Sequence, residues 1–435
     1  MQKDRVRSAL RACARPIAAI VVAAGCASIR ADAPAVPLAV PGRGSANVSL
    51  AAADRFVAAV WSASTESGAA DVYASVSRDA GATFSPPVRV NSTPDAARVN
   101  GEQPPRVALV RKPDGPPSLV VVWTGKGEAG TRLLTARSDD GGKTFGAMAV
   151  LAGTDAPGNR GWETVASDAN GRVDVIWLDH RDTVQGGSAD MSHHLDHNLS
   201  APMQMDSVAR AQLSKLYFSA VGGASQAHIV TSGVCYCCKT ALAIGAGGSV
   251  FAAWRHVYPG NMRDIAFTMS HDGGRTFAAP IRVSEDKWAL DGCPENGPAM
   301  AVDSKQVVHL TWPTLLAGAN GSGALALFYA ASRDGRRFTP REEVPTVGTP
   351  RHVQIVAAGI GSIVLAWDET DDRGRRIAVA RGVARADGRV EFHRQAIGTL
   401  GDASYPAIAW TADGALVAAA SGGDRSTIRV ARLGF

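Results

Sequence analysis

The sequence predicts an all-β protein that forms a single β-propeller of four-stranded blades. A short apolar strand ending in Trp recurs every 54 to 77 residues, and helical periodicity is nearly absent. Each copy follows another apolar strand and precedes an alternating strand and a short final one. Four short strands per repeat are the pattern of a propeller blade. The recurring residues are Trp61, Trp123, Trp177, Trp254, Trp312 and Trp367, and we expect all of them to lie in the core.

The number of repeats favours seven blades, with six as the alternative. A seventh copy of the strand, ALVAAA at 415–420, lacks the Trp, and its repeat has only three clear strands. The segment AVPLAV at 35–40 is therefore predicted to supply the missing strand and close the ring. Because a blade cannot bury its faces alone, residues 34–435 are expected to form one cooperative domain.

The N-terminal segment has the pattern of a secretory signal. Basic residues precede a short apolar run, IAAIVVAAG at 17–25, and small residues follow it. The run is too short for a permanent membrane span. The favoured cleavage site is Ala31-Asp32-Ala33, which makes 1–33 a signal peptide, whereas AAGC ending at Cys26 is the lipoprotein alternative. We expect a periplasmic or secreted protein, lipid-anchored through Cys26 if the alternative holds.

The formal charge gives no reason to expect a nucleic-acid partner. Residues 1–33 carry six Lys or Arg and two Asp, so their removal lowers the net charge from +5 to about +1. The basic character of the chain therefore comes largely from the predicted signal, and the remainder is close to neutral.

A turn motif of the form S-x-D-x-G-x-T-F occurs between the third and fourth strands of several repeats. Ser and Asp side chains can hydrogen-bond the turn backbone, and Gly allows a positive φ angle. Three copies are complete, and the fourth is one residue short: 77–84, 138–145, 270–277 and 332–338. The motif is structural, and it faces away from the predicted channel mouth described below.

With these turns the chain resembles the sialidase-like Asp-box (BNR repeat) propellers over nearly its whole mature length. The phrases CYCCKTALA and DGCPENGPAMAVD look like an exported subgroup with a CxCC motif. The resemblance implies an exo-α-sialidase-type glycoside hydrolase or a glycan-binding propeller. Sialidases need an arginine clamp, a Tyr nucleophile and acidic partners. Residues of these types are Arg106, Arg160, Glu163, Arg255, Arg351 and Tyr405, but the N-terminal Arg-Ile-Pro motif of the family is missing.

The cysteines are predicted to gather at one mouth of the channel. Loops that join consecutive blades emerge on the same face as the loops between second and third strands. Cys235, Cys237 and Cys238 precede the first strand of the fourth blade, Cys293 that of the fifth, and His352 that of the sixth. An insertion in the third blade projects over the same face and contains His193, His194, His197, Met203 and Met205.

Cys, His and Met together in an exported protein indicate a soft metal, most simply copper, because thiolates and thioethers prefer Cu(I). The sequence thus predicts periplasmic copper handling with a metal-delivery or uptake partner, and a sialidase-type hydrolase acting on a glycan is the alternative. Structural disulfides are an equal alternative for the cysteines. Cys293 would then pair with one of the three clustered cysteines and the other two with each other, as Cys235 with Cys238, unless the set is incompletely oxidised. Redox catalysis is a third alternative, and the insertion can equally be a solvated loop.

Overall fold

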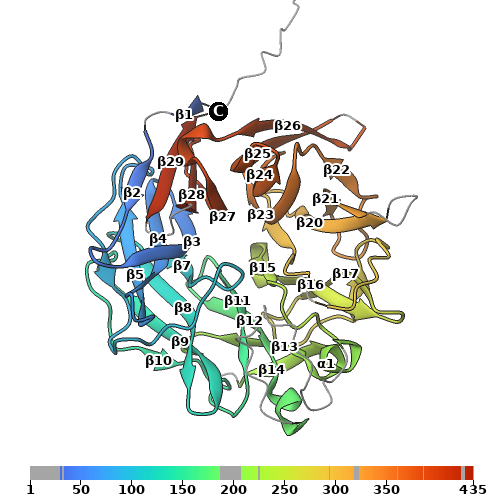
Figure 1. Cartoon of the computed structure of the whole chain (residues 1–435), viewed down its shortest axis with the longest axis horizontal. Helices are drawn as coiled ribbons and strands as arrows, with labels where there is room; N and C mark the ends of the chain where they lie inside the picture. Colours follow the sequence, from blue (N-terminus) through green and yellow to red (C-terminus); the bar gives the residue numbers. More distant parts are fainter. Residues whose placement is uncertain are drawn as a thin grey trace, which may run out of the picture.

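Seven antiparallel sheets are arranged in a ring around a central axis, as Figure 1 shows; the channel named below is the region along this axis, between the first strands of the blades. The computed structural model describes residues 30–31, 34–186, 207–223, 226–292, 294–317, 323–359, 361–385, 387–422 and 427–434. The prediction of seven blades is confirmed, and the six-bladed alternative is wrong. Among the described residues, no helix is long and apolar enough to cross a membrane.

The first three blades each run outward from the channel in chain order. Blade 1 contains β3 (Gly44–Ala53), β4 (Phe56–Ser64), β5 (Ala70–Ser77) and β6 (Val88–Arg89). Blade 2 contains β7 (Arg106–Val110), β8 (Ser118–Gly127), β9 (Gly130–Ser138) and β10 (Ala149–Val150). Blade 3 contains β11 (Arg160–Ser167), β12 (Val173–Asp179), β13 (Lys215–Ala220) and β14 (His228–Ser232). The short helices η1 (Arg181–Gly186) and α1 (Ser207–Leu213) lie between β12 and β13.

The next three blades repeat the same order. Blade 4 contains β15 (Ala241–Ile244), β16 (Val250–Tyr258), β17 (Met262–Ser270) and β18 (Ile281–Arg282), with η2 (Ala246–Gly248) after β15. Blade 5 contains β19 (Ala299–Val302), β20 (Val308–Ala317), β21 (Gly323–Ser332) and β22 (Glu342–Val344). Blade 6 contains β23 (Thr349–Ala357), β24 (Ser362–Asp371), β25 (Gly374–Ala384) and β26 (Val390–Ala396). The helix η3 (Gly398–Leu400) leads into the last blade.

Blade 7 closes the ring with strands from both ends of the chain. It contains β27 (Ala403–Trp410), β28 (Leu416–Gly422) and β29 (Ile428–Gly434), and β2 (Val36–Leu38) pairs with β29. Val36 lies opposite Val430, and Leu38 lies opposite Ile428. Further along β29, β1 (Arg30–Ala31) pairs with its last residues. The closing strand predicted at 35–40 is therefore confirmed.

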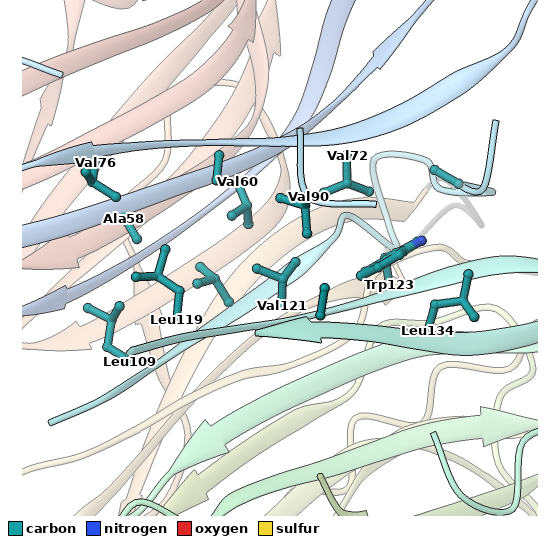
Figure 2. Packing of buried hydrophobic residues seen from close by; sticks show 14 of the residues in the cluster. Ala58, Val60, Val72, Val76, Val90, Leu109, Leu119, Val121, Trp123 and Leu134 are labelled. Atoms are coloured by element: carbon teal, nitrogen blue, oxygen red, sulfur yellow. The ribbon is translucent and has the colours of Figure 1, made fainter. Parts of the chain in front are cut away.

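The cores lie between neighbouring blades, and the recurring Trp residues are central to them. All six are at most 1 % exposed, so their predicted place in the core is confirmed. Between blades 1 and 2, Trp123, Leu119 and Val121 face Val60 and Val72, as Figure 2 shows. Several indole N–H groups bond to a side chain two residues on: Trp177 to Asp179 and Trp367 to Glu369. The strand thus carries both its core residue and that residue's hydrogen-bond acceptor.

The S-x-D-x-G-x-T-F turns have the hydrogen bonds predicted from the motif. In the first copy, Gly81 N–H donates to Ser77 Oγ at 2.8 Å, and Thr83 donates from its backbone N–H and its hydroxyl to Asp79. The copies at 138–145 and 270–277 repeat these bonds. Gly81 has a φ of 89°, which a side chain would strain. The Ser77 hydroxyl and the Asp79 carboxylate therefore fix the turn together.

Asp79 should make the stability of blade 1 sensitive to acid. Burial alone would raise the pKa of Asp79, but hydrogen bonds from Thr83 and Ser77 lower it from 3.8 to about 2. Because the folded state holds the ionised form, its stabilisation is complete above about pH 4 and is lost as the pH falls toward about 2. We expect Asp79→Asn to have a lower free energy of unfolding than the wild type at pH 7, and to lose less of it between about pH 4 and pH 2. Urea unfolding at several pH values measures both proteins. If their free energies of unfolding fell in parallel over this range, the assignment would be contradicted.

Candidate functional site

The cysteine loop, residues 234–239, connects blade 3 to blade 4 at the predicted position. The start of the loop is hydrogen-bonded to the end of β16. Cys235 N–H donates to Arg255 C=O at 2.8 Å, and Val257 N–H donates to the C=O of Gly233, just before the loop, at 2.9 Å. Cys235, Cys237 and Cys238 are all buried. Their side chains are packed with Trp162, Val234 and Trp254. The loop is therefore a fixed part of the blade interface.

The three sulfur atoms lie within 4.8 Å of one another. Cys235 Sγ is 3.3 Å from Cys238 Sγ and 3.9 Å from Cys237 Sγ. Cys235 and Cys238 carry free thiols, whereas Cys237 is disulfide-bonded. The predicted disulfide between Cys235 and Cys238 is thus wrong for this structure, and the incompletely oxidised alternative describes the loop. A two-thiol pair results, with a third sulfur that becomes a thiol only after reduction.

The electrostatic surroundings separate the two thiols. Arg263 Nη1 donates to Cys235 Sγ at 3.2 Å. Burial alone would raise the pKa of Cys235, but the hydrogen bond from Cys238 and the charges of Arg263 and Arg255 lower it to about 6. Burial and the neighbouring Cys235 raise the pKa of Cys238. These opposite shifts make Cys235 the thiol that ionises first and Cys238 the one that donates the hydrogen bond between them.

A neutral histidine lies beside the same loop. His180 is 4 % exposed, its Nδ1 is 3.0 Å from Ser214 Oγ, and its ring packs edge-on against Trp162. Burial lowers the pKa of His180 to about 4, so the ring is uncharged at neutral pH. Its Nε2 makes no hydrogen bond of normal geometry among the described residues, and the ring also interacts with the backbone of Tyr236 in the cysteine loop. The helix α1 covers this side, and Arg210 of that helix stacks over the Tyr236 ring.

A second site opens on the channel itself. A cavity of about 70 Å³ is lined by residues of blades 1, 2, 6 and 7 together with Lys239, which follows directly on Cys238. In it, His352 Nδ1 lies 2.6 Å from Asp368 Oδ1, and His352 Nε2 lies 3.4 Å from Glu102 Oε1. The Tyr405 ring stacks on the His352 ring at 3.8 Å between centroids.

Burial shifts the protonation of several groups at this cavity. Burial raises the pKa of Glu102, whose Oε2 has no hydrogen-bond partner among the described residues. Burial lowers the pKa of Lys239 to about 8, and the amine donates to Val353 C=O. Nearby, burial raises the pKa of Glu163 to about 7, and Thr124 donates to this carboxylate at 2.9 Å. Shifted carboxyl and amine groups together are typical of a functional pocket.

The backbone at the channel mouth is strained in a repeated way. Asn47, Trp162, His352 and Tyr405 have φ angles of 61°, 53°, 53° and 54°, each at a bulge in the first strand of its blade. A residue other than glycine that is held at such a positive φ costs about 1–3 kcal/mol, and strain of this kind is concentrated at functional sites. No sequence signal marks these angles.

The remaining hydrolase candidates do not form a clamp in the structure. Arg106 lines the cavity and donates to Glu163 C=O at 2.9 Å. Arg160 is buried in an ion pair with Asp179 and donates to several carbonyls. Arg255 donates to the carbonyls of Asn296 and Pro313, and Arg351 is exposed. Further predicted ligands lie outside the described residues: Cys293, His193, His194, His197, Met203 and Met205.

Comparison with known proteins supports the fold alone. No protein-family profile and no curated protein matches the chain. The GH93 α-L-arabinofuranosidase of Fusarium graminearum, solved with arabinobiose, aligns at a TM-score of 0.52 and 12% identity over 92% of this chain and 97% of that one. The Hadza microbial sialidase Hz136 aligns at a TM-score of 0.46 and 14% identity, over 84% of this chain and 73% of that one. The intramolecular trans-sialidase from Ruminococcus gnavus aligns at a TM-score of 0.46 and 11% identity, over 76% of this chain and 94% of that one. The alignment with the Fusarium arabinofuranosidase supports the propeller fold.

Proposed function

We propose that this protein binds a soft metal ion, copper as Cu(I), between Cys235 and Cys238. The observation that carries the proposal is a pair of buried free thiols 3.3 Å apart with a guanidinium bonded to one of them. Thiolates are soft ligands that select Cu(I). A modest separation of the two sulfurs would admit an ion between them. In the exported protein that the N-terminal signal predicts, such a site would handle copper in the periplasm.

Other residues extend the proposed site. Reduction of Cys237 would add a third sulfur, since its Sγ lies 3.9 Å from that of Cys235. The neutral His180 ring offers nitrogen on the same side, and imidazole also suits copper. The His and Met residues of 193–205 are proposed to pass the ion from a delivery partner to the cysteines. The apolar wall around the loop would exclude water and strengthen the metal–sulfur bonds.

The test is a titration of the mature chain with Ag(I), a redox-stable substitute for Cu(I), under nitrogen and without added reductant. The wild type should bind about one ion per chain, and Cys235→Ser and Cys238→Ser should each weaken binding by about 100-fold or more. Thr240→Ser is the matched control. Residue 240 lies directly between the cysteine loop and β15, and the substitution keeps a hydroxyl there. Wild-type binding would also raise the melting temperature, since the ligand binds only the folded state.

Two outcomes would overturn the metal proposal. One is wild-type protein that binds no ion although both thiols react with a thiol reagent after denaturation. The other is serine variants that bind Ag(I) as tightly as the wild type.

The channel cavity favours glycoside hydrolysis as a second candidate function. The specific observation is the buried Glu102 carboxyl, whose Oε2 has no hydrogen-bond partner among the described residues and whose raised pKa suits a proton donor, in a cavity of a fold shared with an arabinofuranosidase. Hydrolysis of this kind uses a carboxylic acid with a second carboxylate or nucleophile. The test is turnover of aryl α-L-arabinofuranosides and sialosides. Activity that Glu102→Gln abolishes and Cys235→Ser leaves intact would establish this function, and absence of turnover would remove it.

A further inference from the structure

We infer that the cysteine site accepts a monovalent soft cation and rejects divalent ones, and that Arg263 is the residue that determines this specificity. The inference rests on the proposed metal function and adds the charge class of its ligand. It follows from one guanidinium that bonds to the thiol pair, that of Arg263, and a second whose charge acts on the pair, that of Arg255.

Arg263 is fixed beside Cys235 by a complete set of bonds. Besides Cys235 Sγ, its guanidinium donates to Leu290 C=O at 2.8 Å and to Asn261 Oδ1 at 3.2 Å. Its backbone N–H donates to Trp288 C=O, and the side chain is fully buried. The guanidinium therefore cannot swing away when an ion enters, and its positive charge stays next to the thiolate.

Arg255 supplies a second fixed positive charge. Among the described residues, its guanidinium donates to backbone carbonyls alone, those of Asn296, Arg263 and Pro313, and it lies 4.8 Å from the centre of the Trp288 ring. Among the described residues, neither Arg255 nor Arg263 forms an ion pair with a carboxylate. The thiols are thus the anionic partners left to both. Glu102, whose charge contributes to the raised pKa of Cys238, also interacts with Lys239.

The charges decide which ion fits. Metal binding releases the Cys238 proton to solvent, because both sulfur ligands must be thiolates. Two thiolates and two guanidiniums then sum to zero, so a monovalent ion leaves the buried site with one positive charge and a divalent ion leaves it with two. The desolvation cost of burying a net charge grows with the square of that charge, so the site loaded with a divalent ion carries about four times the cost of the site loaded with a monovalent ion. Two sulfurs also leave a zinc-like ion short of its usual four ligands. Both effects favour a two-coordinate monovalent ion.

The test compares Ag(I) with Cd(II), two soft ions of different charge. The ratio of the Ag(I) affinity to the Cd(II) affinity is measured by competition on the full mature chain. It is then divided by the same ratio measured for dithiothreitol, a free dithiol without guanidiniums. The wild type should prefer Ag(I) by about tenfold or more beyond dithiothreitol. Arg263→Gln should lower that preference by about tenfold, while Arg263→Lys, which keeps the charge, should retain it. Circular dichroism melting verifies that each variant folds.

The outcomes separate this inference from the proposed function. If the wild type binds neither ion, the metal proposal fails. If it binds Ag(I) but shows no greater preference than dithiothreitol, the specificity inference fails and the metal proposal stands. The specificity inference also fails, and the metal proposal also stands, if Arg263→Gln folds and keeps the wild-type affinity ratio. If that variant does not fold, the comparison of the wild type with dithiothreitol tests the specificity inference.

Discussion

Replacing Gly297 with alanine should displace the cysteine loop and weaken metal binding. A Cβ at Gly297 would lie 2.0 Å from the carbonyl oxygen of Lys239, the residue after Cys238. Since the obstacle is backbone, it can be relieved only by moving the loop. We expect the free energy of unfolding to fall by about 3 kcal/mol, at the upper end of overpacking effects, and Ag(I) affinity to fall by about tenfold or more.

Gly398→Ala is the matched control for this substitution. Neither glycine has a positive φ, and a Cβ at Gly398 would meet nothing within 4 Å. Urea unfolding and Ag(I) titration of the two variants separate the steric effect from the general effect of adding a methyl group. If Gly297→Ala matched the control in both measurements, the segment before β19 would not support the loop as described.

Replacing Asp179 with alanine should destabilise blade 3 by about 3–5 kcal/mol, because it leaves a buried positive charge without its partner. Asp179 Oδ2 accepts bonds from Arg160 Nε, Trp177 Nε1 and Arg181 Nη2 at 3.1, 3.1 and 2.6 Å. Arg160 is 2 % exposed, so water cannot replace the carboxylate. The exposed Asp114→Ala is the control and should change stability little.

The pH dependence of this variant gives a second measurement. Burial alone would raise the pKa of Asp179, but Arg181 and Arg160 lower it to about 2. The wild type should therefore lose this stabilisation as the pH falls from about 4 toward about 2, because only the ionised form pairs with the arginines. The variant should lack that part of the acid transition. A wild type and variant that unfold in parallel between these pH values would contradict the assignment.

The fold could be predicted because its signals are local. Each blade carries an apolar strand ending in Trp, and several carry a turn whose Ser, Asp and Gly fix their own backbone. The closing strand at 36–38 could be placed because the last repeat was one strand short. These features depend on residues close together in sequence, so the order of strands followed from the pattern alone.

The site was predictable only in part. The cysteine loop was placed at the channel side of blade 4 by its position before β15. The guanidinium beside Cys235 was not foreseen, since Arg263 belongs to β17 and reaches the sulfur through packing. The same holds for the contact between Glu102 and His352, which joins blades 2 and 6 across the channel. The arginines proposed as a clamp were chosen by residue type, and Arg160 is instead held by the Trp177-x-Asp179 pattern within its own blade.

X-ray absorption spectroscopy of the copper-loaded mature chain tests the central claim most directly. Protein purified without chelator or reductant after growth with added copper should show a Cu(I) edge and sulfur scatterers, and Cys235→Ser with Cys238→Ser should abolish that signal. Copper bound only by nitrogen and oxygen, or copper retained unchanged by the double variant, would show that these cysteines do not form the metal site.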